Sequence, residues 1–105
     1  MRIQDTMAKA QAQAIQAWDS KDPSINEMVC GFSWLWFPVD GRSKLAKELK
    51  SIGAELSHGG GMIISSGDFA DNQSQSMERK ILAVEAAEAV FLADGYKCYT
   101  CARLD

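Results

Sequence analysis

The sequence has few of the residue types on which several common chemistries depend. Its 105 residues include one histidine, three cysteines and two prolines. A single imidazole supplies no histidine cluster for a metal site, and three thiols cannot all pair as disulfides. No run approaches about 18 apolar residues, so no transmembrane helix is expected. The first residues, MRIQDTMAKAQAQAIQAW, lack the apolar segment of a secretory signal, which favours reduced thiols in a cytoplasm.

Positive charge is not in excess either. Lys and Arg number 11 against 14 Asp and Glu, which gives a formal net charge of -3. This balance argues against sequence-independent binding to nucleic acid, because such binding neutralises many phosphates, although a local basic patch is still compatible with it. The length is that of one domain, so we expect a single domain over residues 1–105, with no bound cofactor or metal and no membrane association.

Residues 1–29 are predicted to be an N-terminal helical segment. Ala and Gln, both good helix formers, dominate residues 2–19. The apolar residues that recur on one helical stripe are Ile3, Met7, Ala10, Ala14 and Trp18. This shallow, alanine-rich stripe suits close approach to another helix, either within the fold or across a homodimer.

Residues 30–105 predict the order strand, helix, strand, strand, helix, strand. The predicted strands cover residues 30–37, 54–58, 62–66 and 96–104, and the helices cover 40–53, with Asp40 as the N-cap, and 76–95. This is the split β-α-β order of ferredoxin-like folds. We therefore expect an α+β, ferredoxin-like βαββαβ antiparallel sheet with two helices on one face, preceded by the amphipathic helix. That first helix would lie on the other sheet face or on a partner. A three-stranded sheet is the alternative if 54–58 is a loop.

The first predicted strand is unusually aromatic. Phe32, Trp34 and Trp36 share one face, while Gly31, Ser33, Leu35 and Phe37 share the other. We interpret the aromatic cluster as core, because large aromatic side chains contribute heavily to burial. The alternative is a platform that stacks bases on an open sheet face, but the predicted partner strand offers no aromatic residue there.

Three short segments are candidates for binding. A basic helix start can hold a phosphate or carboxylate, and glycine amides beside the single histidine can hold an anion. A polar segment before the last helix is the third. The candidate residues are Arg42, Ser43, Lys44, Lys47, His58, Gly59, Gly60, Gly61, Gln75 and Ser76. Their spacing matches neither a Walker loop nor a dinucleotide fingerprint.

No catalytic centre emerges from the sequence. The two cysteines of CYTC, Cys98 and Cys101, lie three apart on a predicted strand, so their sulfurs point to opposite faces. We interpret them as free thiols and not as a zinc or redox pair. No nucleophile, base and acid are placed together by spacing, so no catalytic residue is predicted.

A resemblance adds a biological setting. Its matching features are CGFSW from Cys30, Pro38, the helix with Lys44, Leu49 and Lys50, Gly53, the glycines 59–61, QSMERK with the Ala-rich helix after it, Gly95 and ARLD. With these features the chain resembles a family of small proteins of uncharacterised function encoded by tailed bacteriophages. The resemblance covers about three quarters of the chain and implies an early or accessory phage protein in the bacterial host cytoplasm.

These observations together predict a non-enzymatic accessory protein that binds a host or phage protein, for example to inhibit a host function or defence system. The alternatives are a nucleic-acid-binding module, which the net charge disfavours, and a sponge for a nucleotide or another small anion.

Overall fold

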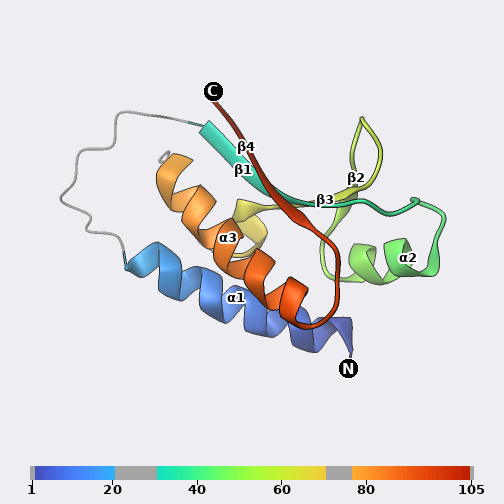
Figure 1. The fold of residues 1–105 in the computed structure, drawn as a ribbon, viewed down its shortest axis with the longest axis horizontal. Coiled ribbons are helices and arrows are strands. Elements are labelled where there is room, and N and C mark those ends of the chain that lie inside the picture. Colours follow the sequence, from blue (N-terminus) through green and yellow to red (C-terminus); the bar gives the residue numbers. More distant parts are fainter. Residues whose placement is uncertain (1, 21–30, 71–76, 105) are drawn as a thin grey trace.

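The computed structural model describes residues 2–20, 31–70 and 77–104. In chain order the elements are α1 (Ile3–Asp19), β1 (Gly31–Phe37), α2 (Lys44–Ser51), β2 (Glu55–Leu56), β3 (Met62–Ser65), the 3-10 turn η1 (Ser66–Asp68), α3 (Met77–Ala93) and β4 (Tyr99–Leu104) (Figure 1). The strands form one antiparallel sheet in the order β2-β3-β1-β4. The predicted α+β class is confirmed, and the three-stranded alternative is wrong.

Several boundaries differ from the prediction. Ser43 caps α2 in place of Asp40, and its Oγ accepts a hydrogen bond from the Ala46 amide at 3.1 Å. Asp40 instead accepts from the Arg42 amide at 3.0 Å, in the turn before the helix. β4 begins at Tyr99 and not at 96, and the expected start of β1 at residue 30 lies outside the described residues. β2 has two residues where the prediction gave five.

The first helix packs along α3 and belongs to the fold. Figure 1 shows α1 and α3 side by side and running in opposite directions. All five residues of the predicted apolar stripe are buried: Ile3, Met7, Ala10, Ala14 and Trp18. The Oγ1 of Thr6 donates to Asp94 at 2.6 Å, and Lys9 pairs with the same carboxylate at 2.8 Å. α1 therefore lies with α3, and the prediction that it covers the other face of the sheet is wrong.

The main core lies between α3 and one face of the sheet. Leu35 and Phe37 of β1 are fully buried, and the ring of Phe37 meets that of Phe91 of α3 edge-on, with centroids 5.2 Å apart. Gly31 and Ser33 are buried on this same face. The buried Lys80 of α3 donates to the Gly31 carbonyl at 2.9 Å, so α3 packs against this end of the strand. None of the described helices combines the length and apolarity needed to cross a bilayer.

Candidate binding face of the sheet

The aromatic side chains of β1 lie on the sheet face opposite the core. Phe32 is 45% exposed, while Trp34 and Trp36 are half-buried. The prediction that this cluster forms the core is therefore wrong. The core instead contains the alternating set Gly31, Ser33, Leu35 and Phe37. The small residues at the start of this set leave space for a packed helix, whereas the large tryptophan side chains would fill that space.

Neighbouring strands extend this surface. Antiparallel pairing places Tyr99 and Arg103 of β4 opposite Trp36 and Phe32, and residues directly opposite each other share a face. Ile63 of β3 is opposite Trp36 on the other side. We call this surface the aromatic face and define it by Phe32, Trp34, Trp36, Ile63, Tyr99 and Arg103.

The side chains of the aromatic face contact one another in pairs. The rings of Trp36 and Tyr99 are 5.9 Å apart between centroids and inclined by 33°. At the other end of the row, the Arg103 guanidinium lies 5.4 Å from the centre of the Phe32 ring. Phe32, beside this cation, is 45% exposed, and Tyr99 at the opposite end is 50% exposed, so aromatic area faces solvent at both ends of the row. This combination is suited to recognition of a partner surface.

The glycine turn between β2 and β3 is fastened to this face. The indole N–H of Trp36 donates to the Gly60 carbonyl at 2.9 Å. Gly61 has φ of +79°, and a Cβ there would lie 2.5 Å from both the Phe37 carbonyl and the Trp36 indole nitrogen. The positive φ and the close approach explain this glycine structurally. Gly59 has open space around it.

A hollow of about 270 Å³ lies on the aromatic face beside this turn, and we call it the Trp34 pocket. Its apolar walls are Phe32, Trp34, Leu56 and Ile63, and its polar lining is Ser57, His58 and Arg103. None of its described lining residues is a carboxylate. Among the described residues, no carboxylate lies within ion-pair distance of Arg103. The pocket is thus apolar inside and cationic at its edge.

The sequence-predicted binding residues fall into separate groups. His58 lines the Trp34 pocket, and Gly60 contacts Trp36, so this part of the prediction adjoins the aromatic face. Ser43 is occupied as the cap of α2, and the exposed residues of the basic segment are Arg42, Lys44 and Lys47. Gln75 and Ser76 lie outside the described residues.

The loop before α2 nevertheless lies next to β2. A Cβ on Gly41 would be 2.6 Å from Cδ2 of Leu56, a pocket residue. Sequence reasoning missed Tyr99 and Arg103 as members of a binding surface. The available signal was the two-residue alternation of the last strand, which puts both on one face.

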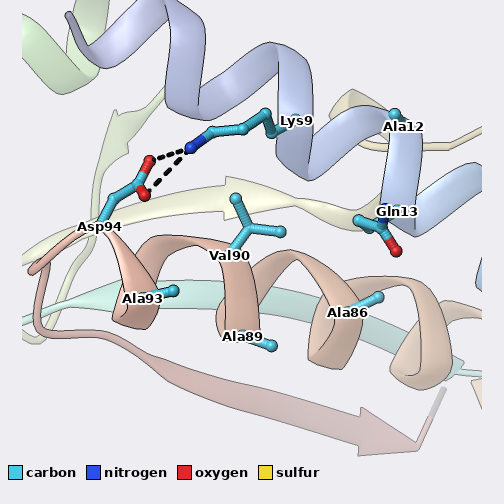
Figure 2. Close-up of a pocket in the computed structure, with 8 residues that line it drawn as sticks. All are labelled: Lys9, Ala12, Gln13, Ala86, Ala89, Val90, Ala93 and Asp94. Atoms are coloured by element: carbon cyan, nitrogen blue, oxygen red, sulfur yellow. Dashed lines mark hydrogen bonds and ion pairs between the residues drawn. The ribbon is translucent and has the colours of Figure 1, made fainter. Parts of the chain in front are cut away.

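A second, larger hollow lies between α1 and α3 (Figure 2). It measures about 530 Å³, and five of its lining residues are small apolar side chains: Ala12, Ala86, Ala89, Val90 and Ala93. Lys9 and Asp94 form an ion pair with each other at one end, and Gln13 completes the lining (Figure 2). The charged groups of this hollow are therefore engaged with each other, in contrast to Arg103 at the Trp34 pocket.

The described thiols are poorly suited to chemistry. Cys98 is 2% exposed, and burial, assisted by the charge of Glu88, raises its pKa to about 12. Burial and Glu88 raise the pKa of the half-buried Cys101 as well. Both thiols are free. In the described ranges no three His, Cys, Asp or Glu side chains gather closely enough to hold a metal ion.

No family model, curated protein or solved structure matches this chain. Of these two hollows among the described residues, the one on the aromatic face has the large aromatic walls and a cation, Arg103, that forms no ion pair with a described residue, so the aromatic face is the strongest candidate site.

Proposed function

We propose that this chain is a small accessory protein without catalytic activity that binds another protein through its aromatic face. The observation that carries the proposal is the open row of Phe32, Trp34, Trp36 and Tyr99, ending at Arg103. Tryptophan, tyrosine and arginine are the residues that contribute most binding energy at protein interfaces. Exposed apolar patches bordered by polar groups commonly mark such surfaces.

We further propose that the sheet and its helices have the ferredoxin-like arrangement. After α1 the chain runs strand, helix, strand, strand, helix, strand, and β1 and β3 are the inner strands. In this arrangement two helices cover one face and the other face is free. The location of the aromatic face supports the proposal.

The biological setting is also part of the proposal. We propose, as the resemblance of residues 30–105 to tailed-phage proteins implies, that the chain acts in the bacterial cytoplasm with a host or phage protein as its partner. Inhibition of a host function or defence system is the role that fits a small protein of this kind.

Single-stranded nucleic acid is the second candidate ligand. The specific observation in its favour is again the aromatic row, because bases stack on aromatic side chains of open sheet faces. Against it stands the small number of cations: Arg103 is the one Lys or Arg that defines the aromatic face, the nearby Lys80 (5.3 Å from the Phe32 ring) donates to the Gly31 carbonyl, and the net charge is -3. This surface therefore offers few positive charges to neutralise the phosphates of a nucleic acid.

Capture from bacterial lysate tests the proposal. The tagged chain, Trp34→Ser and Lys44→Glu are compared with and without nuclease, with circular dichroism as a check on folding. We expect the wild type and Lys44→Glu to retain the same protein after nuclease, and Trp34→Ser to lose it. Loss of all retained material on nuclease treatment would instead favour the nucleic-acid reading.

A further inference from the structure

We infer that the Trp34 pocket binds the C-terminal residue of the partner, with an apolar side chain inside the pocket and its terminal carboxylate on Arg103. This inference rests on the proposed function and adds to it the chemistry of the ligand. It depends on three features of the pocket: its size, its walls and the charge at its edge.

The size limits the ligand to about one residue. The pocket measures about 270 Å³, below the range of roughly 300–1,000 Å³ of sites that enclose drug-sized molecules and cofactors. The walls are two aromatic and two aliphatic side chains, which favour an aromatic or branched aliphatic group. A polar or small side chain would leave this apolar surface unfilled.

The polar residues at the edge of the Trp34 pocket favour a negatively charged ligand. Arg103 and His58 line the pocket; among the described residues no carboxylate lines it, and Arg103 has no ion pair with any of them. The Phe32 ring lies 5.4 Å from the guanidinium carbon of Arg103, within cation–π distance. A planar guanidinium offers two parallel N–H donors to a carboxylate. A cationic ligand would meet the like charge of Arg103 at this edge.

A chain terminus supplies both groups from a single residue. In an extended peptide, neighbouring side chains point to opposite faces, so an internal acid beside the apolar residue would point away from the sheet. The terminal carboxylate is bonded to the same Cα as the side chain that fills the pocket. It therefore reaches Arg103 without a second residue having to enter the hollow.

Small probes test this inference by nuclear magnetic resonance on the full chain. N-acetylphenylalanine carries both groups, its amide lacks the charge, and N-acetylalanine lacks the large side chain. A ligand of this size is expected to have a Kd on the order of 1 mM. We expect saturable shifts of the Trp34 indole signal, with the acid binding on the order of tenfold tighter than the amide and N-acetylalanine binding least.

Two variants distinguish a specific effect of Arg103 on ligand binding from a general effect of positive charge on the protein. Arg103→Gln should bring the affinity of the acid down to that of the amide, while Lys97→Gln, which removes an exposed cation outside the pocket, should leave the preference unchanged. Equal affinities of acid and amide in the wild type, or no shift of the Trp34 indole, would overturn the inference.

Two further probes test whether the negative charge and the apolar group come from a different kind of ligand. Tighter binding of a capped peptide, acetyl-Phe-Ser-Asp-amide, would assign the charge to an internal acid and contradict the terminal assignment. Tighter binding of uridine monophosphate than of N-acetylphenylalanine would assign the pocket to a nucleotide. If the probes fail while Trp34→Ser still abolishes protein capture, this inference falls and the proposed function stands.

Discussion

Trp36 and Gly60 join the aromatic face to the β2–β3 turn. The indole N–H of Trp36 donates to the Gly60 carbonyl at 2.9 Å, and the turn borders the Trp34 pocket through His58. A short hairpin with a two-residue strand has little pairing of its own to hold it. We conclude that this contact helps to fix one wall of the pocket.

Gly61→Ala is therefore expected to destabilise the protein by more than about 1 kcal/mol, because it adds a Cβ at φ of +79° and within 2.5 Å of the Phe37 carbonyl. Gly59→Ala is the matched control, since the space around Gly59 is open. Urea denaturation measures both. Equal stabilities for the two variants would show that Gly61 does not approach the Phe37 carbonyl as closely as described.

The packing of α1 on α3 predicts that Ala10→Leu is destabilising. Ala10 is fully buried, and extra methylene groups in a close-packed interface cost about 1 to 3 kcal/mol. Ala8→Leu adds the same groups on the exposed side of α1 and should change stability by less than about 0.5 kcal/mol. Thermal unfolding of the pair checks the difference. An unaffected Ala10→Leu would place α1 outside the core.

Because of the contacts of Asp94, we expect the free energy of unfolding to depend on pH. The hydrogen bonds from Lys9 and Thr6 lower the pKa of its carboxyl group below the ordinary value. The folded protein thus binds this proton less tightly than the unfolded chain. The stabilisation is complete above the ordinary Asp pKa of about 4 and is lost as the pH falls toward the lower, folded value.

Asp94→Asn should accordingly lower the Tm at pH 7, and its difference from wild type should shrink as the solution is acidified below about pH 4. Asp19→Asn removes the same charge at the exposed end of α1 and should follow the wild type more closely at both pH values. Melting curves across the acid range make the comparison. A difference for Asp94→Asn that did not change with pH would contradict the assigned cause.

The cysteines are predicted to differ in reactivity. In a Cys30→Ser background, iodoacetamide at pH 8 should modify Cys101 before Cys98, because Cys98 is 2% exposed and its pKa is raised to about 12. Addition of denaturant should make the two sites react at similar rates. Mass spectrometry of peptides locates the label. Faster labelling of Cys98 in the native protein would show that it is not buried.

Much of the fold could be predicted from periodicity. The stripe from Ile3 to Trp18 marked the buried side of α1. The α2 cap could not be chosen from the sequence, since Asp40 and Ser43 are both good capping residues. The structure decides in favour of Ser43, whose Oγ receives the Ala46 amide.

The binding face could not be predicted, because both faces of β1 are apolar at the end of the strand. Leu35 and Phe37 compete with Trp34 and Trp36 for the core, and alternation alone does not choose between the pairs. The decision depends on α3, which packs over Gly31 and Ser33 and closes on Phe37 through Phe91. That is a tertiary contact over more than fifty residues, which no local pattern encodes.

Binding through the aromatic face is tested by the Kd of the purified captured partner for two surface variants. Trp34→Ser should weaken binding at least about tenfold, because it removes the centre of the aromatic face. Lys44→Glu, at the start of α2, should leave the Kd within about twofold of wild type. The opposite pattern, with binding lost in Lys44→Glu and kept in Trp34→Ser, would contradict the account and place the interface at α2.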